Sequence, residues 1–430
     1  MKSGSFQPEF TQFGMLPGNS KSGPGQKGAQ SLVRLRELAV EILAQAGHSK
    51  GPLEEAMTTV LSRESGATFQ EFDRSWIFEL CSGVLRYRGR LDFIIDTYSL
   101  KKKPTGEIRR FLQTGVFQLL AQDTPVALVV SECVQAIREM DGEAPSKFAN
   151  AILRKVADSK EQWQNWKVTE QSPFEEQLAW CSLPEWFFKK LRKERGSPWT
   201  FAFSEAVLTR PNLWYRSGED SSILHDGFRG DEPAGYVQDI SNQLLVKEVI
   251  GEIEKLGWRQ PRILDLCSAP GGKSLGLASA GFSVIATDID EDRLEKVREN
   301  SVRLGLSAKI EIRPHASVWD GTDCYDLIWI DAPCSSTGII RKHPEIKWNR
   351  GWHDVERLAL QQEELIHWAR AHLSPGGRIL YSTCSMLKTE NEPQLGSGMC
   401  FGRRMEWVPQ LEPKGDGIHA VWIEMQKIQG

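Results

Sequence analysis

Two cysteines stand just beyond apolar runs that are typical of β-strands, fifty positions apart in the C-terminal half of the chain. Cys334 follows the run YDLIWIDAP, and Cys384 follows the run RILYST. Taken singly, each cysteine is explained as a small buried hydrophobe, because unpaired cysteine is among the most buried residue types. Two cysteines at strand ends of one domain admit a second interpretation, in which a thiolate acts as a nucleophile.

A glycine-rich turn precedes both cysteines, in DLCSAPGGKS at residues 265–274. The phosphate-loop pattern requires glycine where this chain has Cys267, and GxGxxG is absent, so no nucleotide phosphate is predicted here. Asp288 ends the next apolar run, about twenty residues on, where an acid commonly accepts hydrogen bonds from a ribose diol. A ligand-cradling turn without a phosphate signature, followed by such an acid, favours S-adenosylmethionine. The alternative is that Asp288 and Asp290 only cap the helix that follows.

The elements that must position these residues alternate between strand and helix from about residue 235. Strands are predicted in RILDLC, FSVIATDID, AKIEIRP, YDLIWIDAPC and GGRILYSTCS, with helices in GKSLGLASAG, DRLEKVRENSVRLGL and VERLALQQEELIHWARAHL. This alternation predicts a mostly parallel, doubly wound α/β sheet. Ligands bind outside the carboxyl ends of strands in such sheets, which is where the turn, Asp288 and both cysteines fall.

The remainder of the chain has a different texture. Residues 1–30 are rich in Gly, Ser, Pro and Gln and predict a disordered tail. Residues 31–160 space apolar side chains three and four apart, which predicts an all-α domain. Residues 161–232 combine short helical pieces with a candidate strand in RPNLWYRSG and are taken as a connector subdomain. Residues 233–430 form the α/β domain.

The composition limits the classes of protein to which this chain can belong. With 40% hydrophobic and 26% charged residues, the chain is ordinary for a globular protein. No stretch approaches the roughly 20 apolar residues of a membrane helix, and no secretory signal is visible, so a cytoplasmic protein without membrane contact is expected. The eight cysteines include no CxxC pair and predict reduced thiols, with neither disulfides nor a metal site.

Charge gives mixed indications about nucleic acid. A net charge of −4 is weak evidence against a protein that coats nucleic acid. Residues 86–110 nevertheless hold eight Lys and Arg against three Asp and Glu. This stretch is either a solvated helix face with a charged loop, or a patch that contacts phosphates.

Several motifs resemble a known family. LDLCSAPGGKS, DAPCSSTGIIRKHPEIKW and YSTCS closely match the RNA (cytosine-5)-methyltransferases. FANAILRKV, YVQDISNQ and the helical first half resemble the bacterial small-subunit ribosomal RNA methyltransferase B (Sun) group within that family. The resemblance runs from about residue 32 to residue 425. It implies a NusB-like all-α RNA-binding domain followed by a Rossmann-like class I methyltransferase domain that uses S-adenosylmethionine.

The resemblance also implies a reaction and a set of roles. Carbon 5 of cytosine is a poor nucleophile until a thiolate adds to carbon 6, and the family assigns that attack to Cys384 and the later release to Cys334. DNA cytosine methyltransferases place their nucleophile in the Pro-Cys motif instead, so TCS favours RNA. Asp331 would hydrogen-bond the base edge, with Lys273 near the same pocket. The residues implied to bind the cofactor are Cys267, Ser268, Ala269, Pro270, Gly271, Gly272, Lys273, Asp288, His315 and Asp331.

The expected partner is RNA, with small-subunit ribosomal RNA suggested by the resemblance, and a monomer is expected. The target base must be unstacked into the pocket. RKHPEIKW, residues 341–348, offers basic and aromatic groups for RNA beside that pocket. Its alternative interpretation is a charged surface loop.

Two departures from the family keep other functions open. Family members usually carry an acid after the third strand, near the adenine of the cofactor, where IRPHASVW places His315. PQLGSGMCFGRR follows TCSMLKTENE and contains helix-breaking proline and glycine where the family continues into a helix. An RNA-binding or ribosome-assembly factor with a degenerate methyltransferase pocket therefore stays an alternative, and a methyltransferase for DNA or protein is a third.

Overall fold

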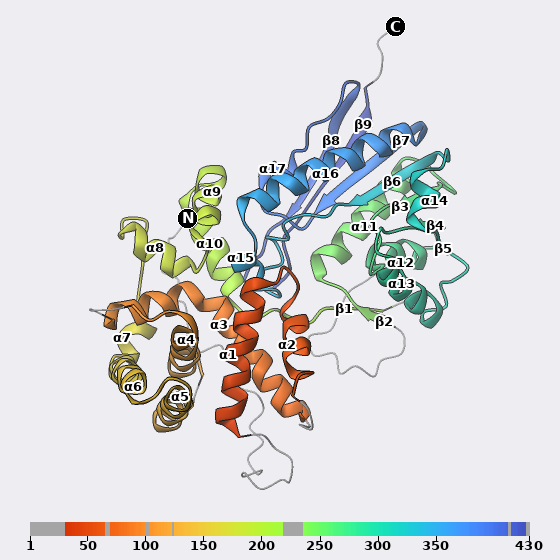
Figure 1. The fold of residues 1–430 in the computed structure, drawn as a ribbon. Helices are drawn as coiled ribbons and strands as arrows, with labels where there is room; N and C mark the ends of the chain where they lie inside the picture. Colours follow the sequence, from red (N-terminus) through yellow and green to blue (C-terminus); the bar gives the residue numbers. More distant parts are fainter. Residues whose placement is uncertain are drawn as a thin grey trace. The chain divides into compact units, whose positions relative to one another are not determined.

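The computed structural model describes residues 31–64, 69–99, 103–122, 124–217, 235–411 and 414–426. The predicted tail and residues 218–232 of the predicted connector lie outside the described residues. The chain forms two compact units (Figure 1). The helical unit runs to Arg210 and also contains residues 340–350, and the sheet unit contains residues 211–339 and 351–430.

The helical unit confirms the prediction of an all-α first half. Its helices are α1 (Leu32–His48), α2 (Leu53–Leu61), α3 (Glu71–Tyr98), α4 (Gly106–Ala121), α5 (Val126–Asp141), α6 (Glu143–Asp158), α7 (Lys160–Gln164), α8 (Phe174–Cys181), α9 (Glu185–Arg195), α10 (Ser197–Leu208) and α15 (Ile346–Asn349). Helix α1 begins after Ser31, whose hydroxyl accepts a hydrogen bond from the Arg34 amide at 3.1 Å, as an N-cap should. Among the described helices of both units, none is long and apolar enough to cross a membrane.

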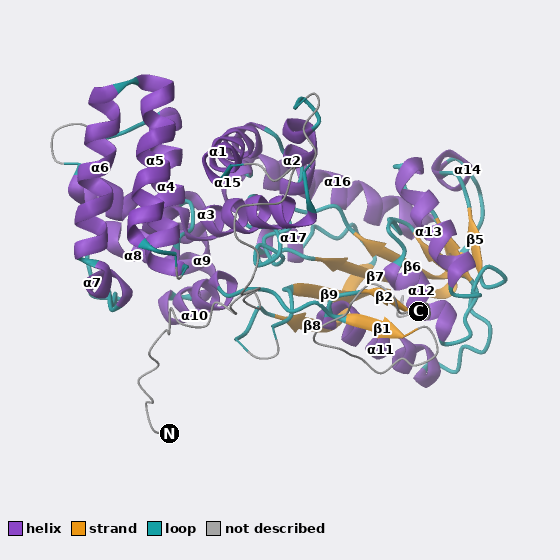
Figure 2. Ribbon diagram, turned by 90° about the horizontal axis from the view of Figure 1, so that it is seen from below, coloured by secondary structure: helices purple, strands orange, loops and turns teal. Residues whose placement is uncertain are grey.

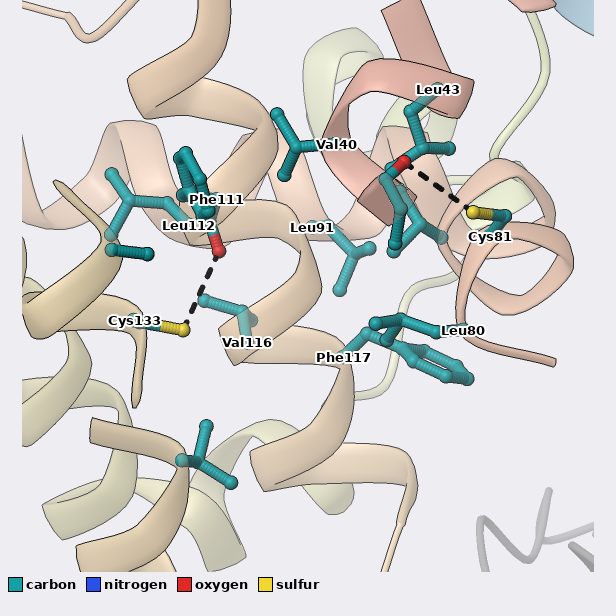
Figure 3. Close-up of a cluster of buried hydrophobic side chains, with 14 of the residues drawn as sticks. Val40, Leu43, Leu80, Cys81, Leu91, Phe111, Leu112, Val116, Phe117 and Cys133 are labelled. Carbon is teal, nitrogen blue, oxygen red and sulfur yellow. Dashed lines mark hydrogen bonds between the residues drawn. The ribbon is translucent and has the colours of Figure 1, made fainter. Parts of the chain in front are cut away.

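Cysteines in this unit behave as buried hydrophobes (Figure 3). The thiols of Cys81 and Cys133 donate to the carbonyl oxygens of Ala39 and Phe111, at 3.4 Å and 3.8 Å. Both side chains are completely buried, and this burial raises the pKa of each thiol. They lie among apolar residues such as Leu112 and so have a packing role.

The predicted connector divides between the two units. Helices α7 to α10 belong to the helical unit. One of the predicted short helical pieces, in PEWFFKKLRKERG, is α9, and Gly196 follows it with a φ of 85°, as a glycine at a helix C-terminus often does. The predicted strand in RPNLWYRSG is β1 (Tyr215–Ser217), which pairs antiparallel with β2 (Gly235–Val237) in the sheet unit.

The sheet unit confirms the predicted doubly wound α/β architecture. Its remaining strands are β3 (Ile263–Asp265), β4 (Val284–Ala286), β5 (Ile310–Ile312), β6 (Tyr325–Asp331), β7 (Leu373–Thr383), β8 (Met399–Trp407) and β9 (Ile418–Met425). Its helices are α11 (Ile240–Lys255), α12 (Gly272–Ser279), α13 (Glu291–Arg303), α14 (His315–Trp319), α16 (Trp352–Ala371) and α17 (Lys388–Asn391). The strand order is β5-β4-β3-β6-β7-β9-β8, with β3 to β7 parallel and β9 antiparallel to both of its neighbours.

The C-terminal segment that departs from the family pattern contains regular strands. The segment GDGIHAVWIEM contains strand β9. The segment after Pro393 carries strand β8 as well, which its glycines did not predict. Strands β9 and β8 therefore extend the sheet beyond β7, and the parallel strands β3 to β7 are all present.

The apolar side chains of β6 point alternately to the two faces of the sheet, and helices cover both faces. Leu327 and Trp329 pack with α11 residues, whereas Ile328 and Ile330 pack with α16 residues. Figure 2 shows the strands lying between α11 and α16. All four side chains are completely buried, so a strand that is apolar on both faces ends at the polar Asp331. From β3 the chain places strands β4 and β5 on one side of the sheet, and then β6 and β7 on the other side. Ligands of doubly wound sheets bind at the point between β3 and β6 where this change of side occurs.

Candidate active site

The two cysteines meet at the carboxyl ends of neighbouring parallel strands. Asp331 at the end of β6 is paired in register with Ser382 on β7, so the turns after both strands begin side by side. The sulfur atoms of Cys334 and Cys384 lie 3.3 Å apart, and both residues are half-buried. The sequence prediction that these residues share one edge of the sheet is confirmed, and their separation allows one proton to be shared between two sulfurs.

Backbone contacts fix the two turns to each other. The Gly338 amide donates to the Cys384 carbonyl oxygen at 2.7 Å, and the Gly417 amide donates to the Gly338 carbonyl oxygen at 2.8 Å. A Cβ atom on Gly338 would lie 2.5 Å from the Gly417 oxygen and 2.8 Å from the Cys384 oxygen. Only glycine fits this crossing, because backbone on both sides leaves no room for a methyl group.

Substituting Gly338 with alanine is therefore expected to lower the free energy of unfolding by about 1–3 kcal/mol, the range for overpacking a filled site. Denaturant titration measures this change. The matched control is Gly251→Ala within α11, where a Cβ would meet no atom within 4 Å and helix propensity predicts a gain of up to about 1 kcal/mol. Equal stability changes in the two variants would contradict the close approach at Gly338.

An ion pair joins the glycine-rich turn to the end of β6. The Lys273 ammonium donates to Asp331 Oδ2 at 2.6 Å and to Asn242 Oδ1 at 2.9 Å. The hydroxyl of Ser382 donates to the other Asp331 oxygen at 2.9 Å. Asp331 keeps 33% of its side chain exposed against 12% for Lys273, so the carboxylate still has a face open to a ligand. Asn242 and Ser382 were not predicted as site residues, because neutral residues within a helix and a strand carry no distinguishing pattern.

The surroundings of the two sulfurs differ. The hydrogen bond with Cys334 lowers the pKa of Cys384, aided by the Ser336 hydroxyl at 3.5 Å and the charge of Lys273, against burial and Asp331. The hydrogen bond with Cys384 raises the pKa of Cys334 well above the usual thiol range, together with burial and a nearby carboxylate. Ser336 has a φ of 61°, an uncommon left-handed conformation for a residue other than glycine, and such strain is found most often at functional sites. These opposite shifts favour Cys384 as the sulfur that is ionised when the pair loses a proton.

Asp288 holds the glycine-rich turn in place. Its carboxylate oxygens accept hydrogen bonds from the amides of Ala269 and Asp290, each at 3.0 Å. Asp290 is the N-cap of α13 and accepts from the Arg293 amide at 3.0 Å. The capping alternative is therefore confirmed for Asp290 but not for Asp288. Contact between Asp288 and a ribose stays a prediction.

The turn itself has the conformation that a close ligand approach needs. Gly271 has a φ of 98° and directly precedes α12. Ser268 shares a hydrogen bond of 2.9 Å with Ser274, and burial raises the pKa of Cys267, so neither side chain is a free nucleophile. The predicted cofactor residues of this turn are contiguous in space because they are contiguous in sequence: Cys267, Ser268, Ala269, Pro270, Gly271, Gly272 and Lys273.

Asp265 is a site residue that the sequence did not predict. Its side chain is completely buried at the end of β3, and burial raises its pKa to about 6. Oδ2 accepts from the Ser274 hydroxyl at 2.6 Å, whereas Oδ1 has no hydrogen-bond partner among the described residues. An unpaired buried acceptor beside the turn suits a cationic ligand, and S-adenosylmethionine carries both an ammonium and a sulfonium group. The acid in DLC could have been noticed as the last residue of its strand.

His315 stands at the start of α14, directly after β5. Its ring stacks on Trp319 with centroids 5.3 Å apart. Its Nδ1 is buried and has no hydrogen-bond partner within the part of the chain that the structure describes. Contact with a cofactor through this nitrogen stays a prediction.

The predicted RNA-facing segment RKHPEIKW belongs to the helical unit, where two of its cations are buried. Lys347 is 2% exposed, and its ammonium donates to the carbonyl oxygens of Arg86 and Ser182 at 2.6 Å and 2.9 Å. Arg341 is completely buried and donates to the Ala206 carbonyl oxygen at 2.9 Å. Both the RNA-contact prediction and its surface-loop alternative are wrong for these cations, because backbone carbonyl groups hold them inside the unit.

Several arginines of the basic stretch 86–110 also bond to other groups of the helical unit, so they do not form the predicted phosphate-contacting patch. Arg86 and Arg90 are 3% and 6% exposed, and Arg90 donates to the Trp180 carbonyl oxygen at 2.7 Å. Arg109 is paired with Asp92 at 2.8 Å and with Asp96 at 2.5 Å. Residues 100–102 lie outside the described residues. Arg86, Arg90 and Arg109 therefore stabilise the helical unit and are not available to phosphates.

Comparison with known proteins agrees with both units. Residues 258–408 match the family described as 16S rRNA methyltransferase RsmB/F, and residues 33–158 match the NusB family. The ribosomal RNA small subunit methyltransferase B of Citrobacter koseri is 30% identical over 401 residues, covering 84% of this chain and 89% of its own length. The protein of that name from Escherichia coli O17:K52:H18 is 32% identical over 357 residues, covering 75% and 81%. The crystal structure of PH0851 has a TM-score of 0.63 at 19% identity, covers 93% of this chain and 100% of its own, and shows a shared fold alone.

Proposed function

We propose a reaction for this chain from the premise that it belongs to the family of ribosomal RNA small subunit methyltransferase B. It is a methyltransferase, and S-adenosylmethionine is its cofactor. The proposed substrate is a cytosine of small-subunit ribosomal RNA, methylated at carbon 5 through a covalent adduct. The observation that supports this proposal best is the pair of half-buried sulfurs 3.3 Å apart with opposite shifts in pKa.

Cys384 is the proposed nucleophile. Its thiolate adds to carbon 6 of the cytosine, forming a carbon–sulfur bond and moving the electrons of the 5,6 double bond toward carbon 5. S-adenosylmethionine supplies the electrophilic methyl group that carbon 5 accepts. A base then removes the carbon 5 proton, the electrons of that bond restore the 5,6 double bond, and the carbon–sulfur bond breaks with its electron pair returning to Cys384 as the thiolate. A thiolate is the required species, and the lowered pKa of Cys384 increases the fraction of this cysteine that is ionised at a given pH.

Cys334 is proposed to assist the release of the product. The hydrogen bond with Cys384, the largest cause of its raised pKa, changes when Cys384 is bonded to the base, but burial and the charge of Glu390 still favour a protonated Cys334. At 3.3 Å it can donate a hydrogen bond to the Cys384 sulfur as negative charge develops there during elimination. Without that donor the adduct should persist.

Asp331 and Lys273 are proposed to hold the base and orient it. The partly open carboxylate of Asp331 is a suitable acceptor for the exocyclic amine of cytosine, which distinguishes cytosine from uracil. Lys273 neutralises this carboxylate and keeps it in place. The cofactor is proposed to bind the turn from Cys267 to Lys273, with Asp288 and His315 at its edge and Asp265 as an additional acceptor.

An adduct-trapping experiment tests this proposal. Cys334→Ala protein mixed with small-subunit ribosomal RNA and S-adenosylmethionine is expected to accumulate a denaturation-resistant protein–RNA adduct, because addition continues while elimination slows. Gel electrophoresis after denaturation detects it, and sequencing of the trapped RNA locates the nucleotide.

Two controls define the outcome. The double variant Cys334→Ala/Cys384→Ala should form no adduct, and Cys324→Ala, which changes an exposed cysteine, should behave like the unmodified protein. An adduct that survives the loss of Cys384 would refute the assigned nucleophile. Absence of both an adduct and cofactor binding would favour an RNA-binding factor with a degenerate pocket.

A further inference from the structure

A buried acid connects the two cysteine turns. Glu390 in α17 is completely buried, and three donors point at its carboxylate. The Ser335 amide donates to Oε1 at 2.7 Å, and the hydroxyls of Ser335 and Ser385 both donate to Oε2 at 2.5 Å. Each of these serines directly follows one of the two cysteines. A single carboxylate therefore contacts the residue after Cys334 and the residue after Cys384.

The surrounding contacts leave this carboxylate little freedom. The Gln362 amide donates to the Pro333 carbonyl oxygen at 2.8 Å and approaches Glu390 Oε1 at 3.5 Å. The Tyr381 hydroxyl donates to the Glu390 carbonyl oxygen at 2.5 Å. The partners of the Glu390 carboxylate itself are two hydroxyls and two amide groups, all of which can donate to an ionised carboxylate. Burial raises the pKa of Glu390, and the bonds from Ser335 and Ser385 oppose that rise.

The charges around the sulfur pair are arranged unequally. Lys273 from α12 and Asp331 from β6 act on Cys384, and their effects on its pKa are opposed. Glu390 from α17 acts on Cys334 and raises the pKa of that thiol, and Tyr381 from β7 is a neutral neighbour whose own pKa is raised by burial. A negative charge near Cys334 and a positive charge near Cys384 both favour the state in which Cys334 is the thiol.

We propose that Glu390 is a positioning residue that holds the two cysteine turns together and determines, by its negative charge, that the shared proton stays on Cys334. This role deepens the proposed function and rests on it, because it explains why the second of two adjacent cysteines is the nucleophile. Glu390 acts through its hydrogen bonds with Ser335 and Ser385 and through its charge.

The test uses alkylation of the full-length protein by iodoacetamide, without RNA or cofactor. The thiolate reacts, so the rate at each cysteine as a function of pH reports its pKa, and mass spectrometry of the peptides separates the two sites. Cys384 is expected to react faster than Cys334 at neutral pH. In Glu390→Gln, which keeps the shape and removes the charge, the ratio of the two rates is expected to fall at least about fivefold, with the pH profile of Cys334 moving to lower pH.

Two matched variants distinguish charge from packing. Glu390→Asp keeps the charge, so it should keep the preference for Cys384 even where the shorter side chain lowers stability. Glu392→Gln removes a half-exposed acid two residues away, which pairs with Arg404, and should change neither rate.

An unchanged rate ratio and pH profile in folded Glu390→Gln would overturn the proposal and leave Glu390 a packing residue. If thermal unfolding shows that Glu390→Gln does not fold, the Asp variant decides, because equal alkylation of both cysteines in that variant contradicts control by charge. Because the assay uses no substrate, a failure here is distinct from a failure to trap the RNA adduct.

Discussion

Cys384→Ser is expected to lower the rate of methyl transfer by at least about a thousandfold, because a serine hydroxyl at neutral pH supplies almost no anion for the proposed attack on carbon 6. The substitution changes one atom at a half-buried position, so folding and the affinity for S-adenosylmethionine should be nearly unaffected. Single-turnover transfer of a labelled methyl group to small-subunit ribosomal RNA measures the rate, and calorimetry measures cofactor affinity.

The matched control for this change is Cys400→Ser, which alters a half-buried thiol in β8 that faces the Glu424 carbonyl oxygen at 3.7 Å. It should transfer methyl groups at the normal rate. If Cys384→Ser retained activity within tenfold while Cys334→Ser lost it, the roles of the two cysteines would be reversed. Loss of activity in both serine variants, with an adduct still trapped only in Cys334→Ala, would agree with separate attack and release.

The strand ends could be predicted from the sequence because their chemistry is local. Each of these strands is an apolar run that ends at a polar residue. Parallel strands bring such ends to one edge of the sheet. Asp331 and the two cysteines could therefore be grouped from the sequence alone, and they do lie together. The turn around Gly271 was predictable for a similar reason, since glycine and its neighbours define a strand–turn–helix unit within ten residues.

Glu390 could not be predicted in the same way. It lies in TENE, a polar run that is typical of an exposed segment, and only its three-dimensional neighbours show that it is buried. Its partner Ser335 is 55 positions away, so no local pattern connects the two residues. Buried acids with this many donors are recognised from geometry, because hydrogen bonding compensates for the burial of charge.

The segment RKHPEIKW shows the opposite error. Arg341 and Lys347 of this segment were taken as solvent-facing because long charged side chains are mostly exposed. Lys347 instead reaches the Arg86 carbonyl oxygen, 261 positions away in sequence, and burial lowers its pKa well below the usual lysine range. Carbonyl groups of the helical unit provide the compensation that charge alone did not indicate.

The second large effect is expected for Lys273→Met. Removing this cation withdraws a positive charge that stabilises the Cys384 thiolate, so the pKa of Cys384 should rise from its lowered value. It also leaves the Asp331 carboxylate, which raises that pKa, without the ammonium now 2.6 Å away. Both changes act in the same direction, and we expect methyl transfer at neutral pH to fall by about a hundredfold.

The pH dependence identifies the cause. In the proposed mechanism activity requires the thiolate, so the rate should rise with pH through the pKa of Cys384, which the hydrogen bond with Cys334 lowers in the unmodified protein. In Lys273→Met this acidic limb should move to higher pH, and activity should partly return above about pH 9. Lys296→Met, which removes an exposed cation on α13, is the matched control and should leave the profile unchanged. A loss of rate that is equal at every pH would instead mean that Lys273 acts by binding cofactor or base, and not through the thiol.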